Sequence, residues 1–62
     1  GLFNINIKQA SFEIFDMAGK KLMNGNTKNG TIDASALNAG NYILNVHLQD
    51  GGKASSLIII EK

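Results

Sequence analysis

The stretch "DASALNAGNYILNV" at residues 33–46 decides the fold of this chain of 62 residues. It passes from a short polar segment through Gly40 into a run in which apolar and polar residues alternate. An alternation with a period of two is typical of a β-strand with one buried face, so we predict a strand over residues 41–49. The side chains expected on its buried face are those of Tyr42, Leu44, Val46 and Leu48.

Tyr42 stands at the first step of this strand, two positions after Gly40. In β-sandwiches, a tyrosine placed after a corner between sheets can turn its hydroxyl back to the backbone a few residues upstream. We therefore expect the Tyr42 ring to be buried and its hydroxyl to bond the backbone near Leu37 or Asn38. Such a bond would clamp the connection that precedes the strand.

The rest of the chain divides into further short strands and turns. Gly19 is expected to supply a positive φ angle in a turn over residues 16–21, and residues 24–30 are expected to form a polar loop. The Asp50-Gly51 pair suits a type I′ hairpin turn. Asp33–Leu37 is expected to form one helical turn, capped by Asp33 or Ser35 and too short to be a helix that stands alone. The alternating pattern places the remaining strands near residues 3–7, 11–15, 22–23, 31–33 and 54–61.

About six short strands at close spacing, with no amphipathic helix, indicate an all-β fold. We expect a small antiparallel β-sandwich of immunoglobulin-like type, or a barrel, forming a single domain over residues 1–62. A chain of this size buries only about 60% of its unfolded surface, so its stability is marginal. It has no cysteine, so no disulfide supports the core.

Composition argues against several classes of function. The formal net charge of +1 gives no general attraction to nucleic acid or to an anionic membrane. The longest apolar run, Leu57–Ile60, is far shorter than the roughly 20 residues of a membrane-spanning helix. No signal peptide is expected, because the first residues already follow a strand pattern.

Candidate chemical groups have simpler structural interpretations. His47 is the single histidine, and one imidazole without Cys or a second His does not make a metal site. The carboxylates of Asp16, Asp33 and Asp50 fall at turns or caps, where Asp accepts backbone N–H bonds. The glycine-rich stretches do not have the spacing of a phosphate-binding loop. The aromatic residues favour the core, except Phe15, which lies off the buried face. We therefore expect no catalytic residue, cofactor or metal.

Three segments, taken in order, resemble the type A C-terminal sorting domain of the Bacteroidetes type IX (Por) secretion system. They are "FEIFDMAGKKL", "IDASALNAGNYILNV" and "GGKASSLIIIEK". The resemblance covers essentially the whole chain, and the order and spacing of the motifs are more specific than any motif alone. The positions that match the family pattern are Asp16, Gly19, Lys20, Ile32, Asp33, Ser35, Leu37, Gly40, Tyr42, Gly52, Lys53 and Lys62.

The resemblance implies a function without chemistry. Such a domain is a sorting signal at the C-terminus of an exported cargo. The outer-membrane secretion machinery recognises it after passage through the periplasm. A sortase-like peptidase commonly removes it, and the cargo reaches the cell surface or the medium. Recognition is expected to use a folded surface that includes the last strand and Lys62. The family-pattern residues serve either recognition or the fold itself, and we favour the fold.

The chain departs from the family pattern at its N-terminus. Members usually begin with a Tyr-Pro-Asn-Pro-like strand ending in Gly, whereas this chain has no proline and Gly1 matches only the end of that motif. The first family strand is therefore expected to be missing, which would leave an unpaired edge and favour an edge-strand dimer. Two other functions remain open: a carbohydrate-binding or adhesive module, and an immunoglobulin-like spacer.

Overall fold

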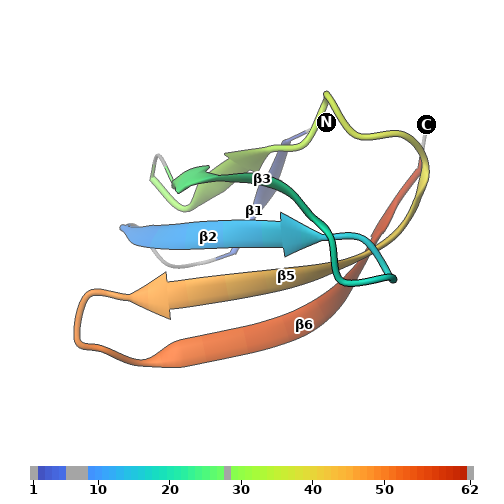
Figure 1. The fold of residues 1–62 in the computed structure, drawn as a ribbon. Helices are drawn as coiled ribbons and strands as arrows, with labels where there is room; N and C mark the ends of the chain where they lie inside the picture. The colour runs from blue at the N-terminus through green and yellow to red at the C-terminus, as the bar shows by residue number, and fades with distance from the viewer. Residues whose placement is uncertain (1, 6–8, 28, 62) are drawn as a thin grey trace.

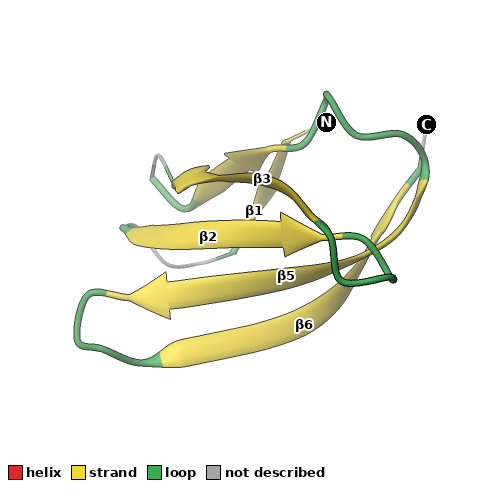
Figure 2. Ribbon diagram, in the orientation of Figure 1, coloured by secondary structure: helices red, strands yellow, loops and turns green. Residues whose placement is uncertain are grey.

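A computed structural model describes residues 2–5, 9–27 and 29–61, and all regular structure in these ranges is β-strand (Figure 2). The all-β prediction is therefore confirmed, with six strands. In chain order they are β1 (Leu2–Asn4), β2 (Ala10–Phe15), β3 (Lys21–Asn26), β4 (Thr31–Asp33), β5 (Gly40–Leu48) and β6 (Lys53–Ile60).

The strands form two antiparallel sheets that make a small sandwich. The larger sheet has four strands in the order β3-β2-β5-β6, and the smaller one is the pair β1-β4. In Figure 1, β1 runs behind the larger sheet, and the loop from β4 to β5 carries the chain from one layer to the other. The core lies between the two layers, as the alternating sequence pattern predicts.

The buried side chains come from alternate positions of the central strands β2 and β5 and from the β4 region. Ile14 and Ile32, one from each sheet, are the largest side chains that are completely enclosed. Fully burying a side chain of this size stabilises the fold by about 1.5–3 kcal/mol. The core consists of Ala10, Phe12, Ile14, Ile32, Ala34, Leu37, Tyr42, Leu44 and Val46.

The predicted polar loop at residues 24–30 is wrong over its first three positions. β3 continues to Asn26, and Gly25 pairs with Phe12 of β2. A Cβ placed on Gly25 would lie 3.5 Å from the Phe12 ring, so the ring packs directly over the glycine backbone. The aromatic ring supplies the contact that a glycine in a strand lacks, and this keeps the polar segment in the sheet.

The β2–β3 and β5–β6 turns have the same geometry. In each, the fourth residue donates its N–H to the carbonyl of the first: Gly19 to Asp16 and Gly51 to Leu48, both at 3.0 Å. Gly19 has φ 92° and Gly51 has φ 91°, which confirms the positive φ predicted for Gly19. Asp50 has no positive φ, so the predicted type I′ turn is wrong. Both loops are type I turns followed by a left-handed glycine.

The segment Asp33–Leu37 forms a single turn with the expected cap and does not continue as a helix. The Leu37 N–H donates to the Ala34 carbonyl at 3.0 Å, and Oδ1 of Asp33, one of the two expected caps, accepts the Ser35 N–H at 3.0 Å. The buried side chains of Ala34 and Leu37 hold this turn against the core, where a continuing helix would carry the chain away from β5.

The first strand is shorter than the alternating pattern suggests. β1 ends at Asn4, and the Ile5 N–H donates to the Gly30 carbonyl at 2.8 Å. Ile7, the last apolar residue of the predicted strand, lies outside the described residues. Among the residues that the structure describes, no helix is long and apolar enough to cross a membrane.

Candidate functional site

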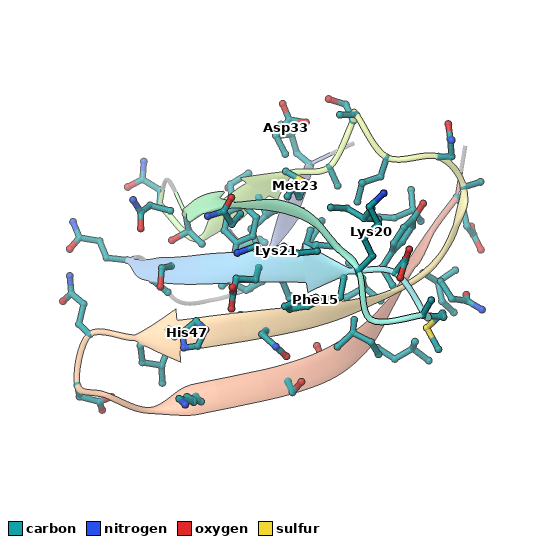
Figure 3. All side chains as sticks on the ribbon, viewed as in Figure 1. Phe15, Lys20, Lys21, Met23, Asp33 and His47 are labelled. Carbon is teal, nitrogen blue, oxygen red and sulfur yellow. The ribbon has the colours of Figure 1, made fainter. Side chains whose placement is uncertain are left out.

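The family-pattern residues gather mainly at one end of the sandwich. The β2–β3 turn, the start of β5 and the end of β6 all lie at this end, whereas the β5–β6 turn lies at the other (Figure 1). We call the end that holds the β2–β3 turn the turn end. It is defined by Asp16, Gly19, Lys20, Gly40 and Tyr42. Figure 3 shows Lys20 there and His47 toward the opposite end.

Asp16 organises the β2–β3 turn through its side chain. One carboxylate oxygen, Oδ1, accepts hydrogen bonds from the backbone N–H groups of Ala18 and Lys20, both at 2.9 Å. The Asp16 N–H also donates to the Lys20 carbonyl at 2.9 Å. Lys20 therefore contributes its backbone to the turn, while its side chain is exposed. Gly19 contributes its positive φ and has open space around it.

Asp33 begins the connection between the two sheets. Its Oδ1 accepts a hydrogen bond from the Ser35 hydroxyl at 2.6 Å and another from the Ser35 N–H at 3.0 Å. These two bonds, the hydroxyl bond first, hold the pKa of the Asp33 carboxyl below its usual value. Leu37, which ends this turn, is buried in the core.

Tyr42 completes the connection and confirms the corner expected from the sequence. Its hydroxyl donates a hydrogen bond of 2.7 Å to the Asn38 carbonyl, and its ring is 9% exposed. The ring lies over Gly40, because a Cβ placed there would meet the Tyr42 hydroxyl oxygen at 3.7 Å. Gly40 and Tyr42 thus form one packed corner at the start of β5.

Gly52 and Lys53 lie apart from the turn end, in the β5–β6 hairpin. The Gly52 N–H donates to Oδ1 of Asp50 at 2.8 Å. A Cβ on Gly52 would lie 3.0 Å from that oxygen and 3.1 Å from the Leu48 side chain, so the site accepts only glycine without a shift. The Lys53 side chain is exposed. Lys62 lies outside the described residues.

The contacts of these residues explain the motifs that they form. A family model described as the secretion system C-terminal sorting domain matches residues 1–61. The chain belongs to this family. Searches of curated proteins and of solved structures find no match to the chain. Membership identifies the chain as a C-terminal sorting signal of the type IX secretion system and as part of an exported protein.

Most family-pattern contacts in this sorting domain are with its own backbone. Asp16 and Asp33 accept backbone N–H bonds, Tyr42 donates to a backbone carbonyl, and Gly19 satisfies a turn. Among the family-pattern residues that the structure describes, Lys20 and Lys53 expose side chains that form no hydrogen bond to another described residue. The side chains of Asp16, Asp33 and Tyr42 thus bond the domain's own backbone, which is the kind of contact that a structural role requires.

A cluster of ionisable side chains that the sequence pattern did not reveal lies on the outer face of the larger sheet, the face turned away from the core. Glu13 lies between two basic side chains: its Oε1 is 3.0 Å from Nε2 of His47, and its Oε2 is 3.5 Å from Nζ of Lys21. The bond with His47, followed by the effects of Lys21, lowers the pKa of Glu13. His47, which the sequence does not support as a metal ligand, thus pairs with Glu13 across the strands. The sequence alone does not show which residues of β3 and β5 lie beside Glu13, so it could not reveal these pairs.

An apolar row crosses the same outer face. Phe15 pairs with Ile43, and Ile43 pairs with Leu57, so the three side chains lie side by side on β2, β5 and β6. The sequence pattern places Phe15 off the buried face but does not reveal these neighbours. Ile59 extends the apolar surface along β6. No group of three or more His, Cys, Asp or Glu residues that could hold a metal occurs in the described part of the sorting domain.

Proposed function

We propose that this sorting domain directs a larger cargo, attached to its N-terminus, through the type IX machinery to the cell surface or the medium. The observation that carries the proposal is the family match over residues 1–61. The domain acts as a recognised surface and performs no chemistry. A sortase-like peptidase then separates it from the cargo.

The geometry supports the turn end as the recognised surface. It joins the β2–β3 turn, the corner at Tyr42 and the last residues of β6 within one end of the molecule. Backbone bonds hold this end in one conformation, so a receptor would meet a preorganised surface. The Lys20 side chain presents its charge there, while the turn contacts of Lys20 are made by its backbone alone.

A delivery assay tests this function. These residues, preceded by a first strand of the family type, are fused to the C-terminus of a fluorescent reporter that is exported to the periplasm. The host is a bacterium with the type IX machinery, and a strain lacking that machinery is the control. We expect the reporter at the surface or in the medium only in the competent strain. A folded fusion that stays in the periplasm of both strains would leave the adhesive or spacer module as the better function.

Two lysine variants locate the recognised surface. Lys20→Glu reverses a charge at the turn end, and Lys53→Glu reverses one at the opposite end, while both keep their backbone contacts. We expect Lys20→Glu to reduce delivery more than Lys53→Glu, with unchanged thermal unfolding of both. Equal delivery by the two variants would exclude the turn end as the recognised surface. Removal of the last five residues should abolish delivery if β6 belongs to that surface.

A further inference from the structure

Strand β6 is an open edge of the larger sheet. It is the last strand in the order β3-β2-β5-β6 and pairs with β5 alone among the described strands. Its pairing runs from Lys53 to Ile60 with no bulge, and it contains no proline. Natural proteins usually protect such edges with bulges, prolines or charges, because unpaired N–H and C=O groups attract another strand.

The hydrogen bonds of the sheet show which β6 residues face the open edge. The Leu48 N–H donates to the Gly52 carbonyl at 2.8 Å, so this pair closes the hairpin as a bonded pair. Bonded and non-bonded pairs alternate along an antiparallel ladder. The following bonded pairs are therefore Val46–Ala54, Leu44–Ser56 and Tyr42–Ile58. The residues whose backbone groups point away from β5 are Lys53, Ser55, Leu57 and Ile59.

The opposite side of the sheet gives the same alternation independently. The Thr27 N–H donates to the Ala10 carbonyl at 2.9 Å, so Ala10 bonds toward β3. Counting along β2 from Ala10, Ser11 and Glu13 bond toward β5, where their partners are His47 and Asn45. The even-numbered residues of β5 are then left to bond β6, as the hairpin requires.

The outward-pointing residues of β6 also carry its exposed apolar side chains. Leu57 is 57% exposed and Ile59 is 64% exposed. Leu57 is the end of the row that starts at Phe15 and passes through Ile43. An apolar row that reaches an open strand edge matches a partner that continues both the sheet and the row.

We propose that β6 pairs antiparallel with β6 of a second copy of this chain, with Leu57 opposite Leu57 of the copy. This alignment places the outward-pointing backbone groups of both strands face to face, as bonded pairs require. The apolar row becomes continuous across the joined sheet, from Phe15 of one copy to Phe15 of the other. The proposal does not depend on the sorting function.

Charge complementarity selects this register. With Leu57 at the centre, Lys53 of each copy lies opposite Glu61 of the other, the residue that directly follows β6, so the dimer gains two Lys–Glu ion pairs. Opposite charges directly across antiparallel strands are favourable. The neighbouring registers, shifted by two residues, place Glu61 opposite Ser55 or beyond the strand and separate the two Leu57 side chains. Both shifts lose the ion pairs. One of them places Leu57 opposite Ile59 of the copy and keeps an apolar contact, so the ion pairs, and not the apolar contact, distinguish the registers.

Cysteine cross-linking of the folded chain tests the register, because the chain has no cysteine of its own. Facing Cα atoms of a bonded pair are about 5.5 Å apart, within disulfide range. Leu57→Cys is therefore expected to give a covalent dimer on mild oxidation. In Ser55→Cys, the matched control on the same face, the two cysteines are offset by about 13 Å and should not join.

A mixture of Ser55→Cys and Ile59→Cys chains adds a second prediction. These positions face each other in the proposed register, so the mixture should yield a mixed disulfide dimer while neither chain alone does. Equal cross-linking of Leu57→Cys and Ser55→Cys would overturn the register. Circular dichroism of each reduced variant checks that it is folded.

Analytical ultracentrifugation of the unmodified chain tests the dimer itself. One pair of strand edges is small beside the roughly 1,600 Å² of a standard interface, so we expect a monomer at micromolar and a dimer at millimolar concentration. Lys53→Glu should raise the dissociation constant by roughly tenfold, through two lost ion pairs. The double variant Lys53→Glu/Glu61→Lys should restore it.

A folded chain that stays monomeric at every concentration, with no cross-linked dimer of the Leu57→Cys variant, would overturn the proposal. It would leave the edge to a strand from another protein. Failure of the dimer is distinguishable from failure of the sorting function, because the delivery assay measures transport and not association.

Discussion

The Tyr42 hydroxyl donates its hydrogen bond to the carbonyl of Asn38, four residues upstream and on the far side of Gly40. The bond ties the start of β5 to the loop that arrives from the other sheet. Because the ring is buried while the bond spans the corner, one side chain fixes both the packing and the path of the connection. The fold depends on this residue where the two layers join.

Tyr42→Phe should lower the free energy of unfolding by about 0.5–1.5 kcal/mol, the usual net value of a hydrogen bond. The phenyl ring keeps its packing over Gly40, so the loss isolates the hydroxyl. Urea unfolding followed by circular dichroism measures it. Tyr42→Leu, which also removes the ring, should lose more. Equal stability of Tyr42→Phe and the unmodified chain would show that the bond does not hold the corner.

Gly19→Ala and Gly51→Ala should be destabilised to a similar extent. Both glycines have φ near 90° in loops of the same geometry, and neither has an atom within 4 Å of an added Cβ. The loss therefore comes from backbone conformation alone, about 1–2 kcal/mol. Thermal unfolding provides the measurement.

Gly25→Ala is the control for the glycine variants. Gly25 has no positive φ, and an added Cβ would make ordinary contact with the Phe12 ring at 3.5 Å. We expect little or no loss of stability. A loss at Gly25 as large as at Gly19 would contradict the conformational explanation.

The carboxyl pKa of Asp33 should lie below 3.8 and rise toward that value in Ser35→Ala, which removes the bond from the Ser35 hydroxyl. Because the folded pKa is lowered, the stabilisation is present above pH 3.8 and is lost as the pH falls through the folded pKa. NMR titration measures the pKa directly. The Glu13 pKa, lowered by His47, should not respond to Ser35→Ala. An unchanged Asp33 titration would exclude the serine as the cause.

Ser55→Pro and Ser56→Pro should differ strongly although they are adjacent. By the alternation of the ladder, the Ser56 N–H bonds β5, whereas the Ser55 N–H faces the open edge. Ser56→Pro should destabilise the sheet by about 3 kcal/mol or more. Ser55→Pro should lose less and should abolish self-association. Chemical unfolding and sedimentation measure the two effects, and the reverse order of stabilities would contradict the assigned alternation.

Sequence patterns were sufficient where neighbouring residues determine the structure. The alternation along β5 and the tyrosine corner both depend on residues within about ten positions of each other, and both are confirmed. The positive φ at Gly19 follows from the need of the turn for a residue without a Cβ.

Pairing between distant strands accounts for what the sequence did not reveal. Gly25 belongs to β3 because the Phe12 ring lies opposite, and no local pattern shows which residue a glycine will face. The outer-face row of Phe15, Ile43 and Leu57 likewise exists only through register. The turn type predicted for Asp50-Gly51 was wrong for a different reason. The same dipeptide fits both a two-residue and a three-residue hairpin loop, and the strand pair that closes the loop, Leu48–Gly52, decides between them.

Only one partner strand at a time can pair with the open edge of β6. A strand edge offers one row of backbone groups, so a strand bound there blocks any other. A domain paired with its own copy at high local concentration would withhold β6 from other proteins, and dilution would release it. Access to the last strand would thus be a matter of competition, set by how crowded the domains are and not by any change in their fold.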